Sequence, residues 1–242
     1  MNINHSMEKI MELPVRTNTV QLIEDLEQIF SILRHEFGNT VNSLKMTLDV
    51  LVRNYDTFDD PAKLEFLHRA MVLVARQHKF LDAMRSYARA AVGEIEEIPL
   101  IFFWSDCVSL ARAKIAGKQI GLKQQIHAEP YNILANSSAI HQVIGHLMDN
   151  AIDAVSDVES PEIELLAFTR IGYCVVQILD NGPGISEEIR SKLFTPFFTT
   201  REGHSGLGLA ISRKMLSQMD GRVELNNRSP RGTAANMWLK IG

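Results

Sequence analysis

The sequence HQVIGHLMDNAIDAV at residues 141–155 decides the fold of the second half of the chain. It predicts an apolar helix that carries Asn150. Two glycine-rich stretches follow in order, DNGPGI at 180–185 and GHSGLGLAI at 203–211. Glycine lets backbone N–H groups approach a phosphate closely, and the N-terminus of a following helix attracts anions. The three stretches together predict a nucleotide site.

The glycine stretches lack the motifs of two common classes of nucleotide site. No Gly-Lys-Ser/Thr follows either cluster, and the dinucleotide spacing GxGxxG is absent. Asp180 ends an apolar strand at a sharp turn, for which a plain turn is the alternative. Asn150 lies in an apolar helix, where its amide needs a polar partner; Mg²⁺ with nucleotide phosphates is one, and a structural cap is another.

Composition excludes several other classes of protein. The 242 residues carry a net charge of −4, with 45% hydrophobic and 22% charged residues, which is ordinary for a globular protein and gives no sign of a nucleic-acid partner. Cys107 and Cys174 lie in apolar runs, which predicts buried thiols. No apolar run approaches the roughly 18 residues that span a bilayer, so we expect no membrane span within this chain and a cytoplasmic location.

The first part of the chain predicts a helical hairpin. Residues 1–16 are polar and are interpreted as a leader, and a long helix begins near Thr17. Its apolar positions recur every three or four residues, at Leu22, Leu26, Ile29, Leu33, Phe37, Val41, Leu44, Leu48 and Leu51. Asp60 and Pro61 are expected to cap and start a second helix that runs to about Ala91, with Leu64, Leu67, Met71 and Val74 among its apolar positions. Two such helices enclose no core alone, so we expect a homodimer that forms a four-helix bundle.

The remainder predicts an α/β domain that follows a hinge at Gly93. Strands are expected at 98–103, 121–126, 131–135, 162–170, 173–180, 222–226 and 233–240, and helices at 105–117, 137–155 and 206–219. The two strands 162–170 and 173–180 are expected to form a hairpin over Ile171 and Gly172. This order favours a mixed sheet with helices on one face.

His35 is the candidate nucleophile of the first helix. It lies two positions from Leu33 and from Phe37, so its imidazole points away from the apolar seam. Asn39 shares its face and Glu36 is adjacent. A carboxylate can take the Nδ1 proton while Nε2 keeps a lone pair for attack on an electrophile. The alternative is a solvated surface histidine, one of eight in the chain.

Residues 194–201 predict a lid over the nucleotide site. Phe194, Phe197 and Phe198 surround Pro196, and Arg201 follows as a candidate phosphate cation. Core packing of the aromatic residues is the alternative interpretation.

These motifs resemble the sensor histidine kinases of bacterial two-component systems, whose ATPase domain is of the gyrase, heat-shock-90 and MutL type. RHEFGN at 34–39 resembles the phosphoacceptor box, HLMDNAIDA at 146–154 the asparagine box, and DNGPG at 180–184 and GHSGLGL at 203–209 the two glycine boxes. Phe194–Phe198 resembles the phenylalanine box, and Gly232–Thr233 the last element. The resemblance covers the chain from about Thr17 onward.

The resemblance implies a fold of class α + α/β. Residues 17–92 are then the dimerisation and histidine-phosphoacceptor hairpin, and residues 95–242 an α/β sandwich that binds ATP and Mg²⁺. It implies that His35, Glu36 and Asn39 act in catalysis, with Glu36 as base and with transfer of the γ-phosphoryl group to Nε2 of His35. The implied ATP-binding residues are Asn150, Asp153, Asp180, Gly182, Gly184, Arg201, Gly206, Leu207, Gly208 and Thr233. Asn150 is the implied metal ligand and His146 a second candidate, because the family often has asparagine where this chain has His146.

The resemblance also implies partners. A homodimer would pass the phosphoryl group to an aspartate in a response-regulator receiver domain, and a sensory partner or domain would supply the signal. Two other functions stay open. One is a histidine phosphotransfer or scaffold protein with a degenerate ATPase domain, and the other is an anti-sigma-type serine kinase, which would need neither the hairpin nor His35.

Overall fold

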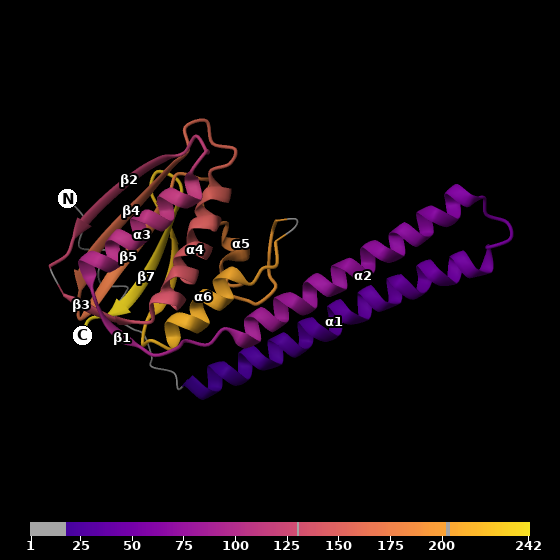
Figure 1. The fold of residues 1–242 in the computed structure, drawn as a ribbon, viewed down its shortest axis with the longest axis horizontal. Coiled ribbons are helices and arrows are strands. Elements are labelled where there is room, and N and C mark those ends of the chain that lie inside the picture. Colours follow the sequence, from indigo (N-terminus) through magenta and orange to yellow (C-terminus); the bar gives the residue numbers. More distant parts are fainter. Residues whose placement is uncertain (1–17, 130, 202–203) are drawn as a thin grey trace. The chain divides into compact units, whose positions relative to one another are not determined.

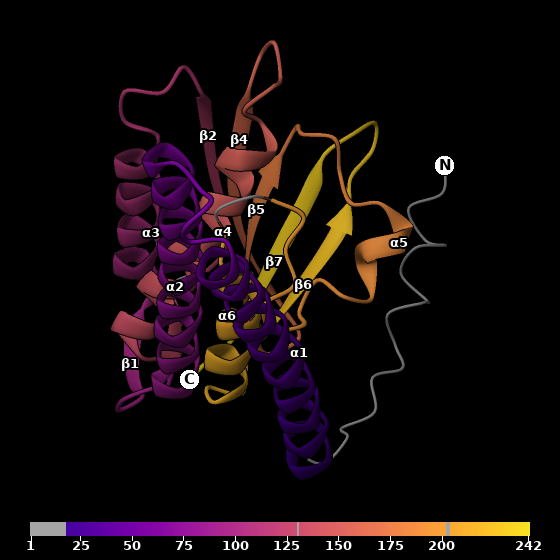
Figure 2. The same ribbon diagram turned by 90° about the vertical axis from the view of Figure 1, so that its right-hand side faces the viewer.

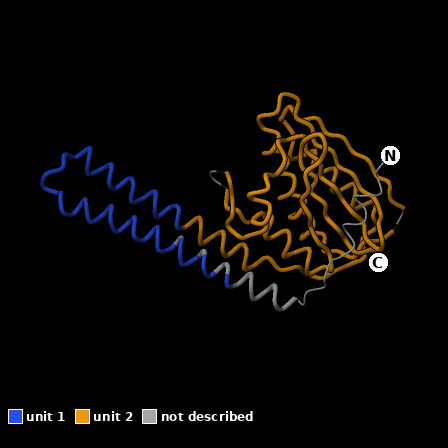
Figure 3. Tube along the Cα trace, turned by 180° about the vertical axis from the view of Figure 1, so that it is seen from behind, with its two compact units in different colours: residues 1–77 blue, residues 78–242 orange. Residues whose placement is uncertain are grey.

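The computed structural model describes residues 18–129, 131–201 and 204–242. Within the first helix, the side chains of residues 18–26, 28, 29, 32 and 36 also lie outside the description. The chain divides into two compact units, residues 1–77 and 78–242, shown in different colours in Figure 3. The boundary falls inside a helix, and the domain limits inferred from the sequence stay predictions.

The first unit is a helical hairpin. It contains α1 (Asn18–Arg53) and the first part of α2 (Asp60–Arg89). Only Thr40, Leu51 and Ala70 are buried among its described side chains. Leu64, Leu67, Met71 and Val74, four positions of the expected apolar seam of α2, are exposed in the single chain. The hairpin therefore presents an uncovered apolar stripe, which costs free energy in water unless a partner covers it.

The start of α2 differs from the expectation by one residue. The carboxylate of Asp59, not Asp60, accepts the backbone N–H of Ala62 at 2.9 Å. That bond, from three residues further on, is the mark of the N-cap position. Asp59 is thus the cap, and Pro61 occupies the second helical position.

The second unit is built on a five-stranded mixed sheet with the order β2-β4-β5-β7-β6. The strands are β2 (Gly121–His127), β4 (Glu162–Arg170), β5 (Tyr173–Asp180), β6 (Arg222–Asn227) and β7 (Thr233–Lys240). β2 pairs with β4 in parallel and the other pairs are antiparallel. β1 (Glu96–Pro99) and β3 (Asn132–Ala135) form a separate antiparallel pair. The expected mixed sheet is confirmed.

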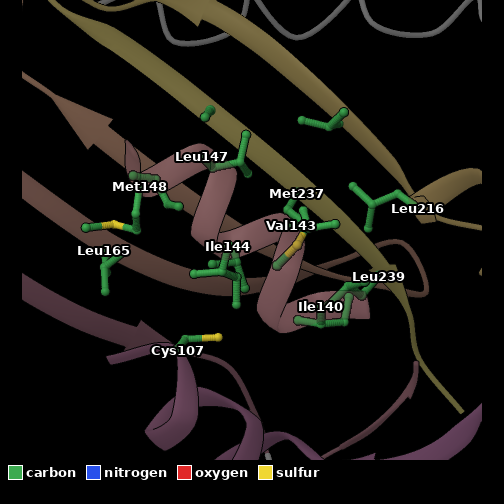
Figure 4. Packing of buried hydrophobic residues seen from close by; sticks show 14 of the residues in the cluster. Cys107, Ile140, Val143, Ile144, Leu147, Met148, Leu165, Leu216, Met237 and Leu239 are labelled. Carbon is green, nitrogen blue, oxygen red and sulfur yellow. The ribbon is translucent and has the colours of Figure 1, made fainter. Parts of the chain in front are cut away.

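Three helices lie on one face of this sheet, as Figures 1 and 2 show. They are α3 (Leu100–Ile115), α4 (Ser137–Ala154) and α6 (Gly208–Ser217), and the short α5 (Glu187–Arg190) precedes α6. The buried core lies between the helices and the sheet, and in Figure 4 side chains of α4 such as Ile144 and Leu147 lie among those of the strands and α6. The inward face of β5 carries every second residue, so Asp180 has the same orientation as Cys174, Val176 and Ile178.

The hairpin of β4 and β5 forms where the sequence places it. Arg170 pairs with Tyr173, so the loop consists of Ile171 and Gly172, with φ angles of 45° and 75°. Two positive φ angles are the requirement of the tight turn that joins antiparallel strands with the natural twist.

The strand expected at 98–103 is wrong beyond Pro99. α3 begins at Leu100 and buries Leu100, Phe103, Trp104 and Cys107, a helical spacing. The continuous apolar run favoured a strand because Ile101 and Phe102, which are 60% and 67% exposed, are apolar as well. A run without alternation does not separate a buried strand from a helix.

The expected hinge at Gly93 stays a prediction, and the structure shows which polar contacts surround it. Gln218 accepts the N–H of Val92 at 3.0 Å, and the side-chain amide of Asn136 donates to the carbonyl of Glu94 at 2.8 Å. Residues 92–94 are therefore bonded on both sides of the glycine to the helical layer of the second unit.

In the described part of the chain no helix is long and apolar enough to cross a membrane.

Candidate functional site

A cleft of about 810 Å³ opens beside the polar face of α4. Gln142, His146, Asn150 and Ala154 follow one another at four-residue steps on this face, and all four line the cleft. Their neighbours Val143, Ile144 and Leu147 are buried in the core. α4 therefore uses one face to anchor the domain and the other to present polar groups.

Most of the expected ATP-binding residues meet at this cleft. Its lining includes Asn150, Asp180, Gly184, Arg201, Gly206, Leu207, Gly208 and Thr233, together with His146. Asp153 and Gly182 are not in the lining, but each is hydrogen-bonded to a residue that is: Asp153 to Arg201 and Gly182 to Asp180. These assignments stay predictions, since the structure shows their placement and not their ligand.

Asp180 is a buried carboxylate held by two backbone donors. It is 4% exposed, and its Oδ1 atom accepts the N–H groups of Gly182 at 2.8 Å and Thr233 at 3.1 Å. Burial raises the pKa of this carboxyl, while the two N–H donors act in the opposite direction. The side chain of Thr233 forms a further hydrogen bond with this carboxylate. Asp180 lines the cleft, so its oriented carboxylate can accept a hydrogen bond from a ligand there.

Two glycines are required by close packing around the cleft. A Cβ atom on Gly182 would lie 2.6 Å from the carbonyl oxygen of Ala154 on α4. Gly206 has a φ of +67°, and its Cβ would lie 2.5 Å from the carbonyl carbon of Phe197. Side chains at these positions would displace the walls of the cleft.

Arg201 and Asp153 are paired with each other. Nη1 of Arg201 lies 2.8 Å from Oδ2 of Asp153, and Nε2 of His204 lies 3.6 Å from the same oxygen. Arg201 lines the cleft, so it faces the place expected for phosphates. As the structure stands, its charge is neutralised by Asp153, and contact with phosphate would require an exchange of partners.

The aromatic segment before Arg201 packs on both sides. The rings of Phe197 and Phe80, a residue of α2 in the same unit, have centroids 4.7 Å apart. The guanidinium of Arg213 on α6 lies 5.7 Å from the centroid of Phe194. Phe198 lines the cleft. The segment borders the cleft as the lid hypothesis requires, while two of its three phenylalanines also pack against helices.

Asn150 and His146 are the candidate metal ligands. They lie one turn apart on α4 and both line the cleft. In the described part of the chain, no group of three or more His, Cys, Asp or Glu side chains could hold a metal ion by itself. A cation here would depend on nucleotide phosphates for its other ligands, as Mg²⁺ usually does, and the amide oxygen of Asn150 fits that ion.

His35 lies in the first unit and is exposed on α1. The side-chain amide nitrogen of Asn39 lies 3.2 Å from its Nδ1 atom and 3.4 Å from its Nε2 atom. The exposure and the shared face expected from the sequence are confirmed. The side chain of Glu36 lies outside the described residues, so its role as base stays a prediction.

Four polar residues at the site were not singled out from the sequence. Ser212 on α6 is fully buried and lies 3.3 Å from His146; a serine within the apolar face of a helix was the available signal. Asn227 both accepts from and donates to the backbone of Ile185, which holds the loop after the first glycine box. Lys114 and Asp149 form an ion pair of 2.7 Å beside His146.

Both cysteines are buried and free, as expected. Burial raises the pKa of each thiol, that of Cys174 to about 12. Neither thiol is therefore a nucleophile at neutral pH.

Residues 135–242, which contain most of this cleft, match the family described as histidine kinase-, DNA gyrase B- and HSP90-like ATPase. The C4-dicarboxylate transport sensor protein DctB of Rhizobium meliloti is 29% identical over 227 residues, which are 89% of this chain. Over most of its length the chain is similar to sensor histidine kinases. It spans 34% of the length of that relative and 35% of the DctB protein of Pseudomonas aeruginosa, so both relatives are about three times as long.

Solved structures give the same result. The catalytic domain of the histidine kinase ThkA is 29% identical, with a TM-score of 0.55 over 61% of this chain and 96% of that domain. A structure of ThkA with the response regulator TrrA covers 93% of this chain and 64% of that one, with a TM-score of 0.61. At 23% identity this second match supports the fold alone. The expected order, a helical region followed by an α/β ATPase domain, is confirmed.

Proposed function

We propose that this protein is an ATP-dependent histidine autokinase that phosphorylates His35. The observation that carries the proposal is the cleft of the second unit. There a buried carboxylate, two glycine boxes and Asn150 surround a space of about 810 Å³, a size that fits a nucleotide. A separate unit carries an exposed histidine beside Asn39.

The chemistry of such a transfer is mainly positioning. Oδ2 of Asp180 would accept the amino group of adenine, and backbone N–H groups near Gly206 and Gly208 would face the phosphates. The bond between the γ-phosphorus and the bridging oxygen would break as Nε2 of His35 bonds to phosphorus, and ADP would leave. Glu36 would take the Nδ1 proton. A bound divalent cation would neutralise charge on the phosphates.

The exposed apolar stripe of the hairpin supports a homodimer. Leu64, Leu67, Met71 and Val74 lie on one face of α2 and are left uncovered by α1. A second copy of the hairpin would bury them and complete a four-helix bundle.

A response-regulator receiver domain is the proposed acceptor of the phosphoryl group from His35. ThkA, whose catalytic domain is 29% identical to this chain, has been solved in complex with the response regulator protein TrrA, which supports the proposed partner. Asn39 is suitably placed to orient a water molecule for the reverse, phosphatase-like reaction. A sensory domain or partner would supply the signal, and use of ATP supports a cytoplasmic location for these residues.

The test is incubation with γ-labelled ATP, followed by exposure of the labelled protein to acid. We expect label that acid removes, because a phosphoramidate is acid-labile, and we expect none on His35→Gln. His68→Gln replaces another exposed helical histidine of the same unit and should label normally. Acid-stable label would instead favour a serine kinase. Tight ATP binding without any label would favour a phosphotransfer or scaffold protein.

A further inference from the structure

Asn227 lies at the end of β6, at the border of the cleft. Side chains alternate between the two faces of a strand, so Asn227 shares a face with Leu225, which lines the cleft. In the sheet Asn227 pairs with Thr233, whose backbone N–H donates to Asp180 at 3.1 Å. Asn227 therefore lies beside the strand end that orients the buried carboxylate, although it belongs to none of the motifs named from the sequence.

The side-chain amide of Asn227 binds both backbone groups of Ile185. Its Oδ1 atom accepts the N–H of Ile185 at 2.7 Å, and its Nδ2 atom donates to the carbonyl of the same residue at 2.8 Å. Two residues that pair across an antiparallel ladder exchange hydrogen bonds in the same way. Ile185 lies in the loop between β5 and α5, so here a side chain takes the place of a strand partner.

The turn after Asn227 makes further contacts with the first glycine box. Nε of Arg231 donates to the carbonyl of Gly182 at 3.3 Å. Gly184 has a φ of +84°, and a Cβ atom there would lie 3.0 Å from Oδ1 of Asn227. The glycine thus lets the loop approach the amide closely enough for both of its bonds. The turn between β6 and β7 therefore fixes the loop that follows Asp180.

This loop carries one apolar wall of the cleft. Ile185 lines the cleft together with Ile178, Leu225 and Ala235. The last three belong to strands of the sheet and are held by its ladders, whereas Ile185 depends on the loop. A flat base is held by contacts on its faces, and a gap of about 0.5–1 Å forfeits a quarter to a half of the dispersion attraction. The position of Ile185 should therefore control how well a base packs in the cleft.

We propose that Asn227 is a positioning residue for the base of the nucleotide, which it orients by fixing Ile185 in the wall of the cleft. The inference rests on the proposed nucleotide site. Asp180 selects a base by a hydrogen bond, and such a bond discriminates well only when the base is held in one place. Asn227 thus adds selectivity for adenine and contributes nothing to the phosphates, which are expected at the second glycine box.

Calorimetry of the whole protein with ATP and with GTP tests the assignment. Asn227→Ala removes both bonds to Ile185, and we expect the affinity for ATP to fall about tenfold, since two hydrogen bonds of ordinary strength are lost. GTP does not present the adenine amino group to Asp180 and depends on its phosphates, so its affinity should change little. The ratio of the two affinities should therefore fall about tenfold.

Two further variants sharpen the test. Asn227→Asp keeps the acceptor for the N–H of Ile185 but sets a second oxygen against its carbonyl, so it should lose at least as much selectivity as the alanine variant. Asn226→Ala is the matched control, because Asn226 is the exposed neighbour on the opposite face of β6. In an autophosphorylation assay, Asn227→Ala should raise KM for ATP far more than it lowers kcat, the sign of lost ground-state binding.

The outcomes distinguish this inference from the function on which it rests. Equal losses of affinity for ATP and GTP would assign Asn227 a purely structural role, which would overturn the inference and leave the kinase proposal intact. Unchanged affinity for ATP in Asn227→Ala, or the same fall in Asn226→Ala, would overturn it as well. Failure of the parent protein to bind ATP would overturn the nucleotide site itself.

Discussion

Asp180→Asn separates the role of this residue in binding from its role in stability. Oδ1 accepts two backbone N–H groups, from Gly182 and Thr233. In the variant the amide oxygen must occupy that place, because the NH₂ group cannot accept. The NH₂ group is therefore forced into the position of Oδ2 and presents a donor where the ligand also presents one. Loss of a hydrogen bond to a charged group costs about 1.5–3 kcal/mol, or roughly ten- to a hundredfold in affinity.

The stability of the variant should not fall with its affinity. Burial raises the pKa of Asp180 in the folded state, so the folded state favours the neutral carboxyl. The resulting stabilisation is fully present below the pKa that Asp180 has in the unfolded chain. It is lost as the pH rises through the pKa that Asp180 has in the folded protein. At neutral pH the buried charge of the carboxylate therefore lowers the free energy of unfolding. Asparagine carries no charge, so we expect Asp180→Asn to have an equal or higher melting temperature.

Calorimetry with ATP, and thermal unfolding without it, would measure the two effects. Asp157→Asn, an exposed position after α4, should change neither. Affinity of the parent protein should also weaken on acidification as Asp180 takes up a proton, with a smaller change in the variant. Unchanged affinity in Asp180→Asn would remove this residue from the site, and a lower melting temperature with weaker binding would point to damage of the fold.

Three further substitutions test other features. Gly206→Ala places a Cβ 2.5 Å from a carbonyl carbon at a φ of +67° and should lower ATP affinity about tenfold by calorimetry, whereas Gly172→Ala, also at positive φ but in open space, should lower only stability. Gly38→Ala lies in the helix α1 with nothing near its Cβ, and should raise the unfolding free energy by about 0.5–1 kcal/mol in urea. Met71→Asp should halve the mass seen by sedimentation while Glu65→Ala should not; a monomeric parent protein would contradict the bundle.

Most helices and strands could be predicted from local sequence patterns. α4 and the hairpin of β4 and β5 were predictable because one has a clear helical period and the other a two-residue turn with a glycine. The start of α3 was not, because both exposed and buried positions from Leu100 onward are apolar. Periodicity identifies an element only where its two faces differ in polarity.

The candidate site was predictable as a set of motifs and not as a set of contacts. The glycine boxes and Asp180 can be identified from residue type alone. Asp153 is paired with Arg201, and Ser212 lies beside His146; these residues are 48 and 66 positions apart in the chain. Such distant pairs become visible only when the sheet brings α4 and α6 together.

The segment that joins α2 to β1 shows how such contacts change a functional argument. A glycine followed by acidic residues suggested a free hinge, since nothing local restrains it. In the folded chain, Lys214 on α6 donates to the carbonyl of Tyr87 at 2.8 Å, and Gln218 accepts from Val92. Both bonds belong to the second unit, so the end of α2 is fixed to the ATPase layer through α6. Any rearrangement that brings His35 to the cleft must therefore occur before Tyr87, within α2, or else must first break the bonds made by Lys214 and Gln218.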